Sequence, residues 1–200
     1  MLADPTGVRR IGVLGGTFDP VHLGHLVTAQ QVAEALDLRQ VIFTPAGRPW
    51  QKSARQVTDP EHRLAMVELA IADNPTFTVS RVDVDRPGAT YAVDTLRDLA
   101  QEFPHTDVKF IVGADALQGF ATWREPDAIL AAAQLVAVTR PGYELADCGL
   151  PPGSFTTVSI TGVDVSSSDC RRRVRNGHTL RYLVPAPVLE YIAAHGLYQS

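Results

Sequence analysis

The sequence predicts an α/β protein with an open parallel sheet, because short apolar strands alternate with helices along most of its 200 residues. An apolar run over 8–14 ends in two glycines, and the apolar positions of 23–36 recur every three or four residues, as in an amphipathic helix. A second apolar run follows at 40–44. This βαβ unit crosses over right-handed, so we expect a doubly wound, Rossmann-like sheet with helices on both faces.

The same alternation continues to the C-terminus. Asp59 and Pro60 have the residue types of a helix start, and Thr90 is expected to cap a helix. We expect further strands at 77–79, 108–112, 135–139 and 155–160, and further helices at 59–71, 91–102, 125–133, 166–175 and 187–194. Residues 45–58 are predicted to form a long substrate loop and 141–154 an exposed excursion. The chain is expected to form one domain, 1–200, with a C-terminal helical part at about 166–198.

Composition excludes several classes of protein. A hydrophobic fraction of 45% with 20% charged residues is ordinary for a globular chain, and no apolar run approaches the roughly 18 residues of a membrane span. The first ten residues lack the pattern of a signal peptide, so we expect a cytoplasmic protein without a membrane partner. Eighteen basic against 22 acidic residues give a net charge of −4, which argues against nucleic acid as a partner. Cys148 and Cys170 lack zinc-ligand spacing and are expected to be structural or incidental.

The segment from Gly15 to Leu26 lies where a doubly wound sheet binds its ligand, between the first strand and the first helix. Glycines let backbone N–H groups approach phosphate, and the helix start adds a positive dipole end. His22 and His25 are placed to face one anion near that helix start. The segment has neither Gly-x-Gly-x-x-Gly nor a phosphate-loop lysine. Taken alone, His-x-x-His is also compatible with a metal pair or with two helix-capping imidazoles.

This twelve-residue segment resembles the opening motif of the nucleotidylyltransferases with a His/Thr-x-Gly-His signature, and most closely the bacterial nicotinate mononucleotide adenylyltransferases. Residues 15–25, Gly-Gly-Thr-Phe-Asp-Pro-Val-His-Leu-Gly-His, match that family's motif without a break. Residues 110–115 and 120–123 are similar to its central segment, and 165–171 to its Ile-Ser-Ser-Thr-x-Ile-Arg signature. The resemblance extends over 182–198 and covers nearly the whole chain.

The resemblance implies transfer of AMP from ATP to nicotinate mononucleotide, by in-line attack of its 5′-phosphate on the α-phosphorus of ATP. The products are nicotinate adenine dinucleotide and pyrophosphate, and Mg²⁺ is expected to be carried mainly by the ATP phosphates, with no metal ligands in the protein. His22, His25 and Arg171 are the implied catalytic residues. The implied ATP-binding residues are Gly15, Thr17, Phe18, His22, His25, Gly113, Asp115, Ser168 and Arg171.

The resemblance also assigns a site for the acceptor nucleotide. Its implied residues are Gly16, Thr17, Lys52, Tyr91, Ala92, Trp123 and Arg124. Trp123 is expected to stack on the pyridine ring, whereas a lone tryptophan is more often a core residue. Asp115 is expected to bind ribose hydroxyls or to cap the following helix. Pro49-Trp50-Gln51-Lys52 stands where many relatives have Pro-His-Lys, and we expect Trp50 to pack over the site entrance.

Other functions remain open at this stage. Phosphopantetheine and cytidylyl enzymes share the superfamily, nicotinamide mononucleotide differs from nicotinate mononucleotide only by an amide, and a non-catalytic nucleotide sensor would need only the glycine turn and Asp115. A solvated face or a nucleic-acid patch could instead be formed by Arg171, Arg172, Arg173 and Arg175, because four arginines in five positions wrap around a helix and at most one or two can face the site. The sequence also leaves a homo-oligomer open.

Overall fold

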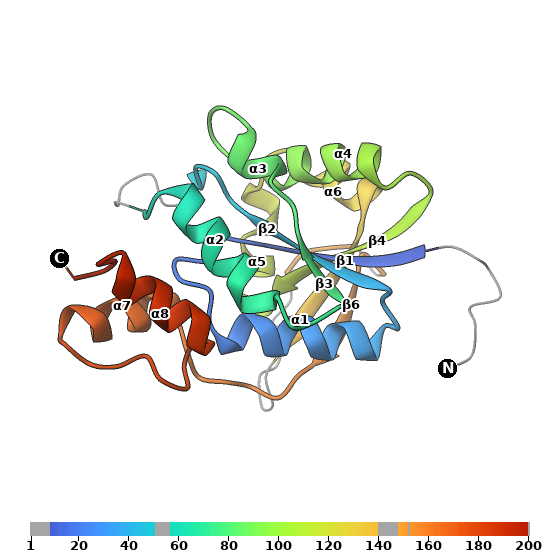
Figure 1. Ribbon diagram of the computed structural model, residues 1–200. Coiled ribbons are helices and arrows are strands. Elements are labelled where there is room, and N and C mark those ends of the chain that lie inside the picture. The colour runs from blue at the N-terminus through green and yellow to red at the C-terminus, as the bar shows by residue number, and fades with distance from the viewer. Residues whose placement is uncertain (1–8, 51–56, 140–147, 152, 200) are drawn as a thin grey trace.

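The computed structural model describes residues 9–50, 57–139, 148–151 and 153–199. Six parallel strands form one open sheet in the order β3-β2-β1-β4-β5-β6 (Figure 1). The strands are β1 (Arg9–Gly16), β2 (Gln40–Pro45), β3 (Phe77–Val79), β4 (Thr106–Gly113), β5 (Gln134–Thr139) and β6 (Phe155–Ser159). The order reverses between β1 and β4, and such a reversal is where open α/β sheets bind ligands. The predicted Rossmann-like fold is confirmed.

Helices cover both faces of the sheet. Their bounds are α1 (Leu23–Ala35), α2 (Pro60–Ile71), α3 (Val82–Asp85), α4 (Ala92–Glu102), α5 (Ala114–Gln118), the 3-10 turn η2 (Phe120–Thr122), α6 (Pro126–Ala132), α7 (Ser167–Arg175) and α8 (Ala186–Ala194). Helices α1, α2, α7 and α8 lie on one side of the sheet, and α4 and α6 on the other (Figure 1). The terminal helices α7 and α8 lie beside α2 and the beginning of α1.

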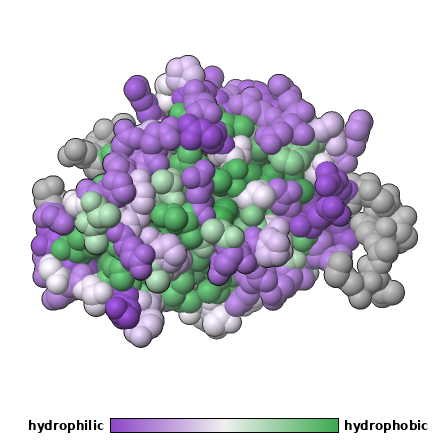
Figure 2. Space-filling model, in the orientation of Figure 1, coloured by the Kyte–Doolittle hydropathy of each residue, from purple (hydrophilic) through white to green (hydrophobic). Residues whose placement is uncertain are grey.

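Alternation along the strands builds two cores, because successive side chains point to opposite faces of a sheet. In β1, Ile11 and Val13 pack toward α4 and α6, and Leu14 packs toward α1 and α2. No helix in the described part of the chain is long and apolar enough to cross a membrane. In the view of Figure 2, hydrophilic residues surround a central area of hydrophobic residues, over the region that holds α1 and α2 in Figure 1.

The structure corrects several local predictions. Thr90 does not cap α4: Tyr91 is the N-cap residue, and the Thr90 hydroxyl instead accepts a hydrogen bond from the backbone N–H of Arg48 at 3.2 Å. Asp115 does not cap the next helix, because Gly113 is the N-cap residue and Asp115 lies inside the first turn of α5. The short elements α3, α5 and η2 were not predicted, since three to five residues are too few to show helical periodicity.

Side chains cap the starts of α2 and α7, and the predicted helix start at Asp59 is confirmed. The Asp59 carboxylate accepts from the backbone N–H of Glu61 at 2.9 Å at the start of α2. The Ser166 hydroxyl accepts from the N–H of Asp169 at 3.1 Å and caps the start of α7. Most of the predicted excursion at 141–154 lies outside the described residues.

Candidate active site

A cavity of about 600 Å³ opens at the carboxyl ends of the strands, beside the point where the strand order reverses. Ten of the predicted site residues line it: Gly15, Gly16, Thr17, His25, Tyr91, Ala92, Gly113, Asp115, Trp123 and Arg124. The cavity also includes Trp50, Asp83 and the ends of β2 and β5. Its size and its mixture of apolar walls with a few polar groups are typical of small-molecule sites.

Gly16 leaves no room for a side chain in the wall of this cavity. A Cβ atom added to Gly16 would lie 2.9 Å from the Phe18 ring, which is itself 1% exposed. The Phe18 side chain packs against Phe43 and the ring of His25, with ring centres 5.8 and 4.9 Å apart. Phe18 is therefore a core side chain, and only its backbone is left for the predicted contact with ATP.

The two histidines meet at the start of α1. Their rings stack with centres 3.7 Å apart, and the backbone N–H of His22 donates to Nδ1 of His25 at 3.2 Å. Since Nδ1 is the acceptor, a neutral His25 carries its proton on Nε2. His25 lines the cavity, whereas His22 is 7% exposed and is the N-cap residue of α1. The two histidines thus lie at the helix start as the capping interpretation expects, and their binding of an anion stays a prediction.

A buried arginine holds the loop after β1. Arg63 of α2 is 0% exposed and donates to the carbonyl oxygens of Thr17 at 2.8 Å, Gly47 at 2.8 Å and Thr58 at 2.7 Å. Burial lowers the pKa of this guanidinium below its usual value, although the charge of nearby Asp19 opposes that effect. One side chain thereby ties the loops after β1 and β2 to α2.

Ser168 and Arg171 lie beside the same loop but outside the lining of the cavity. Arg171 donates to the carbonyl oxygen of Asp19 at 2.6 Å and to the Ser168 hydroxyl at 3.1 Å. Its side chain is 16% exposed, and it lies 3.7 Å from the buried Asp19 carboxylate. The two residues of α7 that are expected to bind ATP thus lie next to the glycine-rich loop rather than in the lining of the cavity.

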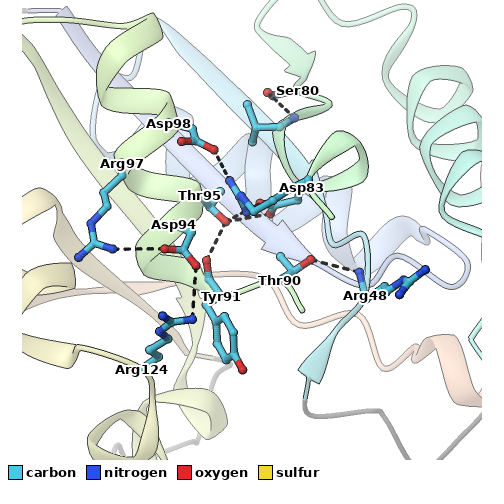
Figure 3. Close-up of polar contacts among 12 residues, drawn as sticks. Arg48, Ser80, Asp83, Thr90, Tyr91, Asp94, Thr95, Arg97, Asp98 and Arg124 are labelled. Atoms are coloured by element: carbon cyan, nitrogen blue, oxygen red, sulfur yellow. Dashed lines mark hydrogen bonds and ion pairs between the residues drawn. The ribbon is translucent and has the colours of Figure 1, made fainter. Parts of the chain in front are cut away.

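The opposite wall of the cavity is aromatic and cationic. Trp50 lines the cavity and stacks on Tyr91 with ring centres 6.0 Å apart, and its packing over the site entrance stays a prediction. The guanidinium carbon of Arg124 lies 4.8 Å from the centre of the Tyr91 ring. Asp94 holds Arg124 at 3.9 Å and Arg97 at 3.2 Å (Figure 3). These contacts keep a cation over the ring.

The amino end of α4 points at this wall without a side-chain cap. Its first turn closes on the Tyr91 carbonyl, which accepts from the N–H groups of Asp94 and Thr95 at 3.1 and 3.2 Å. The N–H groups of the preceding turn positions, including Ala92, are the ones that a helix start leaves for an external acceptor. A carboxylate would suit that position, because it also interacts favourably with the helix dipole.

A partly buried network holds α4 against α3, which in turn packs closely on the loop after β2. Asp83 is 2% exposed and accepts from the Thr95 hydroxyl at 2.8 Å, and Arg86 bridges Asp83 and Asp98 (Figure 3). Burial raises the pKa of Asp83, although the bonds from Thr95 and Arg86 oppose the shift. The Asp83 carbonyl oxygen would lie 2.2 Å from a Cβ atom at Gly47, so only glycine allows this approach.

The remaining predicted residues divide into three groups. Trp123 lines the cavity, and the centre of its ring lies 5.4 Å from that of Phe120 and 6.2 Å from that of Phe110. Part of the Trp123 ring therefore packs against core side chains. Gly113 and Asp115 lie at the end of β4 and the start of α5. Lys52 lies outside the described residues.

Cys170 fills a core position of α7. It is 0% exposed, and burial raises the pKa of its thiol to about 11, so the thiol stays neutral and acts as a small hydrophobe. Arg172 is exposed and pairs with Asp169, and Nε of Arg173 donates to the Thr179 carbonyl at 3.2 Å. These contacts agree with the solvated-face interpretation for the arginines after Arg171.

The structure adds cavity-wall and loop-holding residues that sequence reasoning missed: Thr44, Arg63, Asp83 and Tyr198. A signal existed for Arg63, which shares the buried helix face of Met66, Val67 and Ala70 and stands out there as a charge. No group of three or more His, Cys, Asp or Glu side chains within the described ranges is placed to hold a metal ion.

The buried hydroxyl of Thr44 leads to a prediction about the stability of the protein without ligands. It is 1% exposed beside Gly15, and its hydroxyl has no hydrogen-bond partner among the described residues. We expect Thr44→Val to raise the free energy of unfolding in urea by about 1 kcal/mol, because a buried unpaired polar group costs about 1–3 kcal/mol. Thr95→Val should do the opposite, since it removes a donor from buried Asp83. A Thr44→Val protein less stable than wild type would show that the Thr44 hydroxyl has a hydrogen-bond partner after all.

Comparison with known proteins defines the class first. The model of the cytidylyltransferase-like family matches residues 13–173. The solved structure of "Plasmodium falciparum nicotinic acid mononucleotide adenylyltransferase complexed with NaAD" has a TM-score of 0.79 at 16% identity, covering 95% of this chain and 97% of that one. The sheet order, the glycine-rich loop and the histidine pair together define a Rossmann-like nucleotidyltransferase.

Similar proteins of known sequence identify the family within this class. A protein of Leifsonia xyli subsp. xyli (strain CTCB07), named "Probable nicotinate-nucleotide adenylyltransferase", is 52% identical over 191 residues, which are 96% of this chain and 94% of the relative. A protein of the same name from Paenarthrobacter aurescens (strain TC1) is 52% identical over 187 residues, 94% of this chain and 90% of the relative. The chain belongs to the nicotinate-nucleotide adenylyltransferase family, as the sequence resemblance implied.

Proposed function

We propose that this chain transfers AMP from ATP to nicotinate mononucleotide, releasing pyrophosphate and forming nicotinate adenine dinucleotide for NAD biosynthesis. The observation that carries the proposal is that one cavity joins the loop of His25 to the wall of Trp50, Tyr91 and Arg124. The first wall suits phosphates and the second suits an acidic aromatic ring. Family membership at 52% identity to relatives of that name supports the same reaction.

The donor half of the cavity holds ATP in this proposal. Backbone N–H groups of Gly15 and Thr17 contact the phosphates, and Nε2–H of His25 donates to an oxygen of the α-phosphate, with His22 behind it. Ser168 and Arg171 contact the β- and γ-phosphates, which extend past the cavity toward α7. Gly113 and Asp115 bind the adenosine ribose.

The acceptor half holds nicotinate mononucleotide. Trp123 stacks on the pyridine ring, and the ring carboxylate accepts from the amino end of α4 near Tyr91 and Ala92, close to Arg124. Gly16, Thr17 and Lys52 contact the acceptor phosphate. An uncapped helix start and a cation in one wall favour a carboxylate over the neutral amide of nicotinamide mononucleotide.

The reaction then needs orientation rather than a general base. An oxygen of the acceptor 5′-phosphate is already anionic and forms a bond to the α-phosphorus, while the bond from that phosphorus to the bridging oxygen breaks and pyrophosphate leaves with the electron pair. Donors such as Nε2–H of His25 stabilise the charge on the α-phosphate oxygens. Mg²⁺, held by the ATP oxygens and water, supplies further neutralisation of the leaving group.

Two further parts of the proposal concern the whole chain. We propose that residues 1–200 act as one domain, because α7 and Tyr198 near the C-terminus contact the loop that follows β1. A homo-oligomer is compatible with this arrangement, since the cavity is lined by residues of one chain.

The proposal is tested by pyrophosphate release from the purified protein with ATP and Mg²⁺. We expect turnover with nicotinate mononucleotide, much less with nicotinamide mononucleotide, and none with phosphopantetheine. Turnover with phosphopantetheine alone would assign the chain to another branch of the superfamily, and ATP binding without turnover on any acceptor would favour a nucleotide sensor.

Trp123 should separate the two halves of the cavity. We expect Trp123→Ala to raise KM for nicotinate mononucleotide about tenfold or more, because base–aromatic stacking is worth about 1–3 kcal/mol. KM for ATP should change much less. Steady-state kinetics with each substrate varied in turn measure both constants, and the reverse pattern would move Trp123 to the adenine site.

A further inference from the structure

The loop between β1 and α1 is closed from behind by the C-terminal part of the chain. The Ser167 hydroxyl donates to the carbonyl oxygen of Pro20 at 2.9 Å. The Leu183 carbonyl oxygen accepts from the N–H of Leu23 at 2.9 Å, at the first residue of α1. Segments more than 140 residues away in sequence therefore set the path of the loop that carries His22.

Asp19 is the centre of this contact. The residue is 1% exposed, and its carboxylate Oδ1 accepts a hydrogen bond from the Tyr198 hydroxyl at 2.9 Å. Its other oxygen, Oδ2, lies 3.7 Å from the guanidinium of Arg171, which also donates to the Asp19 carbonyl at 2.6 Å. One buried carboxylate thus links the end of the chain to the cation of α7.

Tyr198 has the properties of a permanent donor. Burial is the main cause that raises the pKa of its phenol above the usual value, and the negative charge of Asp19 is the second. The hydroxyl therefore keeps its proton throughout the neutral range. The same hydroxyl lies 4.0 Å from Sδ of Met66 in α2, within the core of that face. The phenol is partly buried there and is not among the residues that line the cavity.

We propose that Tyr198 is a positioning residue for the ATP phosphates, acting through Asp19 on Arg171 and on the loop that leads to His25. The assignment of ATP to this loop rests on the proposed function, but the tether itself is a property of the fold. Removing the Tyr198 hydroxyl leaves the Asp19 carboxylate a choice of orientations. Arg171 then keeps its bonds to the Asp19 carbonyl and to Ser168 but loses the fixed negative charge that faces it. The effect should appear on the ATP side of the reaction and spare the acceptor side.

The test compares Tyr198→Phe with Tyr191→Phe. Tyr191 lies in the same terminal segment, but its hydroxyl bonds to Nδ1 of His62 at 2.9 Å. Binding of α,β-methylene-ATP is measured by calorimetry, together with KM for each substrate and the unfolding temperature. For Tyr198→Phe we expect about tenfold weaker binding of the ATP analogue, with KM for the acceptor within about twofold of wild type. Tyr191→Phe should bind the analogue as wild type does.

A double mutant separates positioning from a general loss of stability. If Tyr198 acts through Asp19 and Arg171, Tyr198→Phe should have little further effect on analogue binding in an Arg171→Met background. Full additivity of the two substitutions would overturn the proposal, as would equal losses of affinity for ATP and for the acceptor. Analogue binding needs no turnover, so an inactive wild type would refute the proposed function and leave the tether testable.

Asp19→Asn provides a second variant should Tyr198→Phe not fold. The amide keeps an oxygen for the Tyr198 hydroxyl and removes the charge that faces Arg171. We expect it to weaken binding of the ATP analogue and to spare the acceptor, in the same direction as Tyr198→Phe. Analogue binding equal to wild type would overturn the role of the carboxylate.

Discussion

Replacing His25 by alanine is expected to lower kcat for nucleotidyl transfer by about 100-fold or more, with a smaller change in KM for either substrate. The loss of one fixed donor to developing charge commonly costs about 10²–10³ in rate. The geometry supports this role, because the imidazole lines the cavity and its Nδ1 is already occupied by the N–H of His22 at 3.2 Å. Single-turnover pyrophosphate release gives the rate of the chemical step.

Two amide variants test which nitrogen of His25 acts. The amide of glutamine reaches the position of Nε2, whereas the amide of asparagine reaches only that of Nδ1. We expect His25→Gln to keep more activity than His25→Asn, since donation from Nε2 is the proposed function of the ring. His105→Asn is the matched control, because His105 is exposed and precedes the amino end of β4, whereas the cavity lies at the carboxyl ends of the strands. If His25→Ala turned over near the wild-type rate, the residue would have no catalytic role.

The sequence predicted the parts of the fold that depend on local pattern. Strand β1 and helix α1 begin and end within two residues of the prediction, because apolar periodicity and the glycine turn are both encoded within a dozen residues. The cavity-lining residues after β1 and β4 followed from the rule that parallel strands place their ligand at their carboxyl ends.

The contacts that shape the site could not be predicted in the same way. Tyr198 and Asp19 are 179 residues apart, and Arg63 and Thr17 are 46 apart, so no local pattern pairs them. Thr90 shows how a distant contact can replace a local one. Its residue type suits a helix cap, but its hydroxyl accepts a hydrogen bond from the N–H of Arg48 in the loop after β2. Tertiary contacts decided these cases.

Replacing Arg63 by methionine is expected to destabilise the protein by about 3 kcal/mol or more, since each buried acceptor left unpaired costs about 1–3 kcal/mol. Three carbonyl oxygens, from Thr17, Gly47 and Thr58, would lose their donor at once. Methionine keeps most of the apolar stem and adds no new polar group, so the loss of stability reports on the guanidinium rather than on packing.

Urea unfolding with Arg97→Met as the matched control separates this effect from a general loss of charge. Arg97 is also a helix arginine with acidic partners, but its side chain is half exposed, so its replacement should leave the midpoint close to that of wild type. Arg63→Lys should be nearly as unstable as Arg63→Met, because one ammonium group cannot reach three carbonyls that lie around a planar guanidinium. An Arg63→Met midpoint equal to wild type would show that water replaces the guanidinium without cost, and the loops after β1 and β2 would then need another anchor.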